Sequence, residues 1–230
     1  VEVAVRDNRP AFQTWWDGTG FNISDGDHSA GAGWIKASTA PEVAPPTGAV
    51  WSLPATTVTF VTSIYGYSVN ARALDYANNV TAPVSTFSFI FDGVKPAAVL
   101  QKPPVLANLT VSNLPYISGT ASDNIGLSKV QVRIKSNGPG LFWNPGDYTA
   151  GDFKFVRGET DEGAWFDAAN TANWSTGPFN AGFYQNTKAY SVHARAVDNA
   201  GNIAYFTAAT FTFTTELPEF RAQKHELQSG

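Results

Sequence analysis

Four aspartates are candidate calcium ligands: Asp75, Asp92, Asp123 and Asp198. Asp198 opens the turn Asp198-Asn-Ala-Gly-Asn202, and Asp75 opens a related turn, Asp75-Tyr-Ala-Asn-Asn79. Ca²⁺ is a hard cation that takes about six to eight oxygen ligands, carboxylate oxygens among them. We therefore consider a site in which Asp198 joins Asp123 or a carboxylate of the segment between domains, and a corresponding site in which Asp75 joins Asp92.

The same turns also have a purely structural interpretation. Asp and Asn side chains commonly hydrogen-bond backbone groups of their own tight turn. The chain contains no Asp-x-Asp-x-Asp-Gly loop, which would identify a dedicated calcium-binding loop. The sequence therefore leaves two alternatives, a turn stabilised by its own side chains or a turn that also holds calcium. Calcium is the only cofactor that the residues suggest.

Three tryptophans suggest a second kind of site. Trp15, Trp16 and Trp143, the last beside Phe142, lie in hairpin regions rich in Gly and Asn. Exposed aromatic rings in such a place would form a platform on which sugar rings stack. The alternative is that these residues belong to the core or close a hairpin, because both copies of the repeat described below contain them.

Catalytic groups are scarce. The three histidines are His28, His193 and His225, and no nucleophile elbow, zinc-protease helix motif or phosphate-binding loop is present. The residue that corresponds to His193 in the other repeat copy is Asn70, so the fold does not require a histidine there. We expect no enzyme activity.

The composition indicates the class of protein and excludes some kinds of partner. Among the 230 residues, 43% are hydrophobic, 13% are aromatic and only 15% are charged, which favours a packed β-rich protein over a disordered one. The net charge of −4 and the absence of a basic run predict no nucleic-acid partner. No apolar run approaches the roughly 18 residues of a membrane-spanning helix. Without cysteine, disulfides are excluded.

An internal repeat determines the predicted organisation. Tyr67-Ser-Val-Asn-Ala-Arg-Ala-Leu-Asp recurs 123 residues later as Tyr190-Ser-Val-His-Ala-Arg-Ala-Val-Asp, and Trp51-Ser52 recurs at the same offset as Trp174-Ser175. Two further matches have offsets of 124 and 129 residues: Thr86–Phe89 with Thr210–Phe213, and Val1–Val5 with Val130–Ile134. A period of this length is the size of a whole domain. The chain should therefore contain two copies of one domain.

Alternation of apolar and polar residues predicts antiparallel strands in both copies. The expected strands are 1–6, 66–74, 86–91, 129–135, 189–197 and 209–214. On the repeated strand, the alternation places Tyr67 and Val69, like Tyr190 and Val192, on the buried face.

The repeated motifs resemble a known family. Gly119–Ile134, Phe142-Trp-Asn144, Trp165, Trp174-Ser175 and Tyr190–Asn202 are similar to the bacterial Ig-like tandem repeat domains of large secreted and cell-surface proteins. The first copy matches from its third strand onward but has Asn78 where the family has Gly. Asn tolerates positive φ better than most residues, so we expect the turn to be kept.

The resemblance implies an all-β protein of two tandem Ig-like antiparallel β-sandwiches, the first lacking its N-terminal strands. The predicted boundaries are 1–92 for the first sandwich, 93–104 for a proline-containing linker, 105–216 for the second sandwich and 217–230 for a tail or the start of a following segment. The open first sandwich would be completed either by sequence upstream or by strands from another chain, for example from the tail 217–230.

The resemblance also implies a function. We expect a non-catalytic extracellular structural or assembly module, such as a spacer, matrix, filament or adhesin stalk segment, from a longer repeat protein that is secreted or on the cell surface. Its partners would be neighbouring Ig-like domains, and calcium would stiffen its domain junctions. The alternative is a carbohydrate-binding accessory domain with a polysaccharide partner. Four glycosylation sequons begin at Asn22, Asn79, Asn108 and Asn173.

Overall fold

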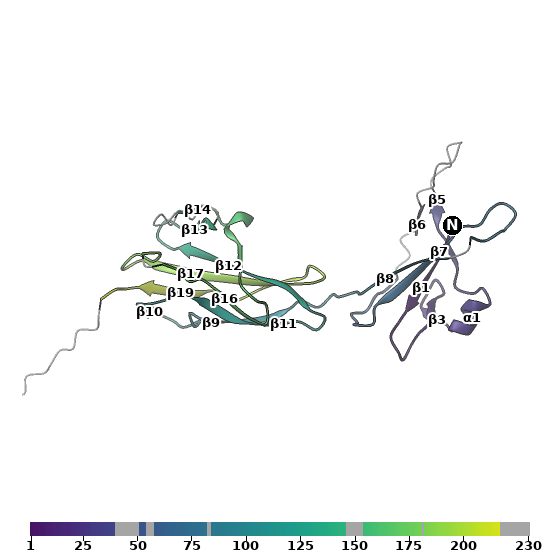
Figure 1. The fold of residues 1–230 in the computed structure, drawn as a ribbon, viewed down its shortest axis with the longest axis horizontal. Coiled ribbons are helices and arrows are strands. Elements are labelled where there is room, and N and C mark those ends of the chain that lie inside the picture. The colour runs from purple at the N-terminus through teal and green to yellow at the C-terminus, as the bar shows by residue number, and fades with distance from the viewer. Residues whose placement is uncertain (40–50, 54–57, 82–83, 146–153, 181, 217–230) are drawn as a thin grey trace, which may run out of the picture. The chain divides into compact units, whose positions relative to one another are not determined.

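The chain forms two compact units, Val1–Val94 and Lys95–Gly230, in the computed structural model (Figure 1). The structure describes residues 1–39, 51–53, 58–81, 84–145, 154–180 and 182–216. The regular secondary structure of the described residues is almost entirely β-strand, in mainly antiparallel sheets, with one short α-helix and one 3₁₀ helix, which confirms the predicted all-β class. None of the helices in this part of the chain is long and apolar enough to span a membrane.

The first unit contains eight strands and one short helix among its described residues. In chain order they are β1 (Glu2–Asp7), β2 (Trp15–Trp16), β3 (Phe21–Ile23), α1 (Asp25–Ser29), β4 (Ile35–Lys36), β5 (Ser38–Thr39), β6 (Trp51–Ser52), β7 (Tyr67–Arg72) and β8 (Ser85–Phe89). Its main sheet has the order β3-β2-β1-β7-β8, with β4 also paired to β1, while β5 and β6 form a separate pair.

The second unit contains strands β9 to β19. They are β9 (Ala97–Lys102), β10 (Leu109–Val111), β11 (Ile117–Ser122), β12 (Leu127–Ser136), β13 (Leu141–Trp143), β14 (Phe155–Arg157), β15 (Phe166–Asp167), β16 (Asn173–Thr176), β17 (Ala189–Asp198), β18 (Ile203–Tyr205) and β19 (Ala209–Phe213), with a 3₁₀ helix at Glu162–Ala164. The larger sheet has the order β10-β19-β17-β12-β13-β14, with β15 and β18 added to β12 and β17. The smaller sheet has the order β16-β11-β9.

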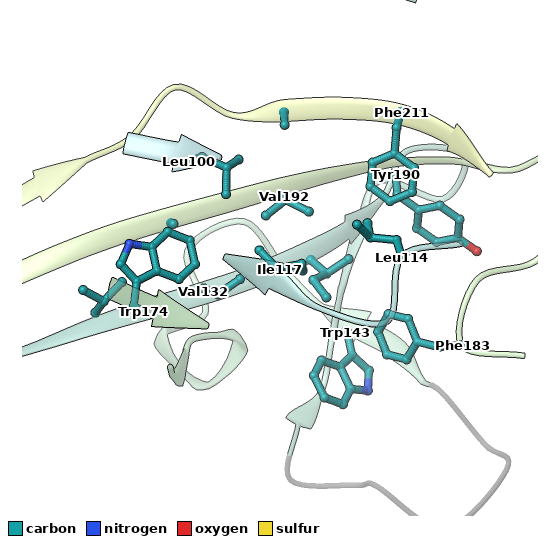
Figure 2. Packing of buried hydrophobic residues seen from close by; sticks show 14 of the residues in the cluster. Leu100, Leu114, Ile117, Val132, Trp143, Trp174, Phe183, Tyr190, Val192 and Phe211 are labelled. Atoms are coloured by element: carbon teal, nitrogen blue, oxygen red, sulfur yellow. The ribbon is translucent and has the colours of Figure 1, made fainter. Parts of the chain in front are cut away.

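A single hydrophobic core lies between these two sheets (Figure 2). The larger sheet contributes alternate residues of β12 and β17, among them Val132, Tyr190 and Val192. The smaller sheet contributes Ile117 from β11 and Trp174 from β16. Burial of one face of each sheet is what the alternation in the sequence predicts, and it gives the second unit the two layers of a sandwich.

The two units repeat the same strand pairings. In the first unit Val5 pairs with Val69, and in the second Ile134 pairs with Val192 at the matching positions. This confirms the predicted offsets of 129 residues between β1 and β12 and of 123 residues between β7 and β17. All six predicted strands are present, as β1, β7, β8, β12, β17 and β19.

The pairing of the last strand in each unit shows that one of the predicted offsets between the two copies is wrong. Tyr67 pairs with Phe89, and its counterpart Tyr190 pairs with Phe211. The offset between β8 and β19 is therefore 122 residues, not 124, and Ala209 rather than Phe211 is the counterpart of Phe87. The similarity of the two Thr-Phe motifs is misleading because a shift of two residues keeps the same side chains on the same face.

The predicted linker is also corrected. Strand β9 occupies Ala97–Lys102, within the predicted linker 93–104, and pairs with β11 in the second unit. Pro96 and Pro103 immediately flank this strand, where a missing N–H costs no ladder hydrogen bond. The prolines thus bound a strand instead of marking a spacer. The predicted tail 217–230 lies outside the described residues.

The described residues of the first unit contain no counterparts of β9, β10 and β11, whereas only two lacking strands were predicted from the sequence. Tyr67 is buried like Tyr190, but Val69 is only half-buried whereas Val192 is fully buried, so the prediction for Val69 is wrong. In the second unit, β9 and β11 supply the layer that covers the inner face of the larger sheet. The corresponding face around Val69 lacks such strands among the residues described.

Candidate functional site

The two Asp-containing turns have the same hydrogen bonds. In the second unit, Oδ1 of Asp198 accepts from the backbone N–H groups of Ala200 and Asn202 at 2.9 and 2.8 Å, and Oδ2 accepts from the side-chain amide of Asn202 at 2.8 Å. In the first unit, Asp75 accepts the corresponding bonds from Ala77 and Asn79 over 2.7–2.8 Å. Both turns therefore have the hydrogen bonds that the structural interpretation expects, and these bonds are compatible with either alternative for Asp198.

The turn of the first unit keeps its shape without glycine. Asn78 has φ +65°, and Gly201 at the corresponding position has φ +91°. The hydrogen bonds from Asn79 and Ala77 hold the pKa of Asp75 below its usual range, because they stabilise the ionised carboxylate. A negative charge is thus part of how the Asp75 turn is built.

Only one of the predicted aspartate pairs comes together within a unit. The carboxylate oxygens of Asp123 and Asp198 lie within 4.8 Å of each other. Asp123 precedes β12, whose first residue pairs with Asp198 at the end of β17, and the N–H of Asn199 donates to the carbonyl of Gly126 at 3.0 Å. The loop and the turn are therefore held side by side at one end of the sheet.

The environment of this pair suits a cation. Oδ2 of Asp123 accepts from the N–H groups of Ile125 and Gly126, both at 2.8 Å, whereas Oδ1 is buried and has no hydrogen-bond partner. Asp198 is almost completely buried. Among the described residues, no Lys or Arg forms an ion pair with either carboxylate. Two ionised carboxylates this close repel each other, and a cation between them would offset that repulsion.

The predicted pair of Asp75 and Asp92 is wrong. Tyr67 pairs with Phe89, so Asp92 follows the end of β8 that lies beside the start of β7. Asp75 follows the opposite end of β7, where Ala71 pairs with Ser85. The two carboxylates therefore lie at opposite ends of the sheet. Asp92 is buried, and its Oδ1 accepts from the N–H of Val94 at 3.0 Å.

All three tryptophans proposed for sugar stacking are buried. Trp15, Trp16 and Trp143 are each less than a tenth exposed. The indole of Trp15 stacks on His28 with ring centroids 3.5 Å apart, and its Nε1–H donates to Oδ1 of Asp25 at 2.7 Å. Trp143 packs edge-on against Phe183 at 5.0 Å. These rings serve the core and the hairpins and present no open face to a sugar.

The histidines of the two units lie in different surroundings. Burial lowers the pKa of His28, although Nδ1 donates to the carbonyl of Ala32 at 2.7 Å. Burial and the nearby Arg133 lower the pKa of His193. Neither lies beside a nucleophile in the hydrogen bonds that the structure describes. His225 lies outside the described residues.

In each unit an arginine stacks on a tryptophan, a contact that was not predicted from the sequence. The guanidinium of Arg72 lies 4.0 Å from the ring centroid of Trp34, and that of Arg195 lies 4.4 Å from that of Trp165. Arg72 also pairs with Glu2, while Nε of Arg195 donates to the side-chain carbonyl of Gln131 at 2.9 Å. The repeated Ala-Arg-Ala motif and the tryptophan of each copy contained the signal for this contact. The bonds to Glu2 and Gln131 join β7 to β1 and β17 to β12, while the stacking attaches the same arginines to the tryptophans that precede β4 and β15.

No known protein family and no curated protein sequence matches this chain.

The four asparagines that begin the glycosylation sequons are all exposed in the structure: Asn22, Asn79, Asn108 and Asn173.

Proposed function

We propose that this chain is a non-catalytic extracellular structural or assembly module, built from tandem Ig-like domains of a longer secreted or cell-surface repeat protein. The observation that carries the proposal is the agreement of strand register between the two units: β1 with β7 in the first matches β12 with β17 in the second. Arrays of one repeated domain are typical of proteins that span distance or assemble, since each copy contributes length.

Three contacts repeated in both units support this proposal. They are the tyrosine at the start of the central strand, the arginine stacked on tryptophan and the Asp-to-Asn turn. Each one joins strands or closes a turn, so its effect is on the fold. The features that the two copies share are therefore contacts that stabilise the fold. This pattern is expected when the folded domain itself, and not a binding or catalytic site, provides the function.

We also propose that calcium binds at Asp123 and Asp198. The support is the short distance between their oxygens and the buried Oδ1 of Asp123 that lacks a hydrogen-bond partner. Calcium bound there would offset the repulsion between the two carboxylates and stiffen the turn.

The location of the protein tests the main proposal. An antibody raised against the second unit is applied to intact cells of the source organism and to permeabilised cells, with a cytoplasmic protein as the matched control. The proposal expects labelling of intact cells, and removal of that label when intact cells are treated with protease. Labelling that requires permeabilisation would contradict an extracellular module.

The carbohydrate-binding alternative keeps no support from the residues on which it rested. Trp15, Trp16 and Trp143 are buried, and stacking on a sugar needs an exposed ring face. We therefore propose the structural role alone.

A further inference from the structure

One face of the first unit is open where the corresponding face of the second unit is covered. Phe87 on β8 is 67% exposed, whereas its counterpart Ala209 is fully buried. Trp51 on β6 is 39% exposed, whereas its counterpart Trp174 is 1% exposed. Trp51, Val69, Ala73 and Phe87 correspond in the repeat to Trp174, Val192, Ala196 and Ala209, which are all buried in the second unit. We call these four positions of the first unit the open face.

The second unit shows what occupies such a face. Strand β11 pairs with β16 so that Gly119 lies opposite Trp174, and β9 pairs with the other edge of β11. The residues on either side of the glycine that point the same way, Ile117 and Ala121, are both buried in the core. Ile117, Leu100 and Trp174 belong to the same buried cluster as Val132 and Val192 (Figure 2). A glycine-bearing strand thus covers the tryptophan.

The glycine is required by the tryptophan. A Cβ placed on Gly119 would lie 2.4 Å from Cζ2 of Trp174 and 2.1 Å from the backbone oxygen of Val99. Real Cβ atoms do not approach that closely. A strand that covers a tryptophan at this position must therefore carry glycine opposite the indole.

The first unit has the matching half of this arrangement. Ser38 pairs with Ser52 next to Trp51, just as Ala169 bridges to Ser175 next to Trp174. In the second unit the other edge of β16 is taken by β11, but among the described residues the other edge of β6 has no strand partner.

The edge strand of the main sheet is open in the same way. In the second unit β10 pairs in parallel with β19, with Leu109 opposite Phe211. In the first unit β8 is the last strand of its sheet in the part of the chain that the structure describes. Two strand edges of the first unit, those of β6 and β8, therefore have no partner among the described residues, and in the second unit one continuous segment, residues 97–122, fills both corresponding places.

We propose that the open face of the first unit binds a strand segment of the β9–β11 kind, in which an Ile-x-Gly-x-Ala stretch pairs with β6 and places its glycine against Trp51. Backbone hydrogen bonds to β6 and β8 supply binding, and the apolar residues on either side of the glycine supply specificity by covering Val69 and Phe87. The source of this chemistry is another copy of the same repeat segment. The inference deepens the assembly part of the proposed function and rests on it.

The test uses the full chain and a synthetic peptide with the sequence of residues 95–122. Binding is measured by isothermal titration calorimetry and located by NMR through the indole N–H signal of Trp51. We expect one peptide per chain and a shift of the Trp51 signal. A peptide with Gly119→Val should bind at least tenfold more weakly, because its side chain would collide with the indole.

Two variants of the chain distinguish peptide binding at the open face from non-specific binding elsewhere on the protein. Phe87→Asp changes a side chain that is mostly exposed, so it leaves the unit folded, and it should weaken peptide binding at least tenfold. Val156→Asp changes a residue of β14 that is 55% exposed in the second unit and should leave binding unchanged. No binding of the parent peptide at 100 μM, or equal binding by the Gly119→Val peptide or the Phe87→Asp chain, would overturn the proposal. Failure here leaves the cell-surface test of the function unaffected, so the two outcomes can be told apart.

Discussion

The hydroxyl of Tyr190 accepts a hydrogen bond from the backbone N–H of Gln185 at 2.8 Å. In the first unit, Tyr67 accepts the same bond from Val61 at 2.8 Å. Each tyrosine starts the central strand of its sheet and ties the preceding loop to it, while its ring packs on the last strand, as Tyr190 does on Phe211 at 5.8 Å.

Removal of this hydroxyl should destabilise the second unit measurably. Tyr190→Phe keeps the ring but removes the acceptor, so we expect a loss of about 1 kcal/mol in the free energy of unfolding. Urea denaturation followed by circular dichroism measures it. Tyr76→Phe is the matched control, since Tyr76 is fully exposed, and should change the free energy by less than about 0.5 kcal/mol. Equal effects of the two variants would show that the bond contributes nothing.

Gly119→Ala should also destabilise the second unit. The added methyl group would overlap Trp174 and the backbone of β9, and overpacking of this kind costs about 1–3 kcal/mol. Gly138→Ala is the control, because a Cβ at Gly138 meets nothing within 4 Å. The measurement is the shift of the thermal midpoint. A neutral Gly119→Ala variant would argue against the close contact.

Valine-to-alanine changes at matching positions should differ in cost. Val192 is fully buried, so Val192→Ala should lose about 1–3 kcal/mol of stability. Val69 is half-buried, so Val69→Ala should lose less than half of that amount. Chemical denaturation of both variants gives the comparison, and an equal loss would mean that the face around Val69 is covered in solution.

Calcium should stabilise the chain through Asp123. At a free calcium concentration 100-fold above the dissociation constant, binding to the folded state alone adds about 2.7 kcal/mol. Scanning calorimetry should therefore show a lower melting temperature after chelation. Asp123→Asn should remove this difference, while Asp75→Asn, in the turn of the first unit that corresponds to the Asp198 turn, should leave it in place. A transition that chelation does not move leaves the turns as structural features alone.

Stability should fall between about pH 7 and 5. Burial lowers the pKa of His28 and His193, so the unfolded chain, with histidine values near 6.5, takes up protons first as the pH falls. The stabilisation is complete above about pH 6.5 and is lost as the pH drops through the folded values. Arg133 and Lys135 also lower the pKa of His193, whereas Glu159 raises it.

His193→Asn tests this expectation, because Asn70 occupies the matching position in the first unit. Urea midpoints measured at pH 7.5, 6.5 and 5.5 should depend less on pH in the variant than in the parent chain. A midpoint that rises on acidification of the parent chain would contradict the lowered pKa values.

The sequence predicted most of the fold because repetition and alternation reinforce each other. Val3 and Val5 are buried as their alternation requires, and the tyrosines match in both units. The position of β9 was missed because Pro96 and Pro103 suggested a linker. Its pairing with β11, about 20 residues later in the chain, leaves no local pattern in the sequence. The pairing of Asp75 with Asp92 was wrong because strand direction, which separates them, is not visible in spacing alone. The stacking of Arg195 on Trp165 joins residues 30 positions apart, so the repeated motifs contain both residues but do not show that they meet.

The parallel pairing of β10 with β19 has a mechanical consequence. A force that pulls β19 from its C-terminal end and β10 from its N-terminal end slides two parallel strands past each other, so every hydrogen bond between them is loaded at once. An antiparallel pair pulled apart from one end instead opens bond by bond, at a lower force. In the described part of the first unit β8 has no such parallel neighbour. Under tension the second unit should therefore yield last.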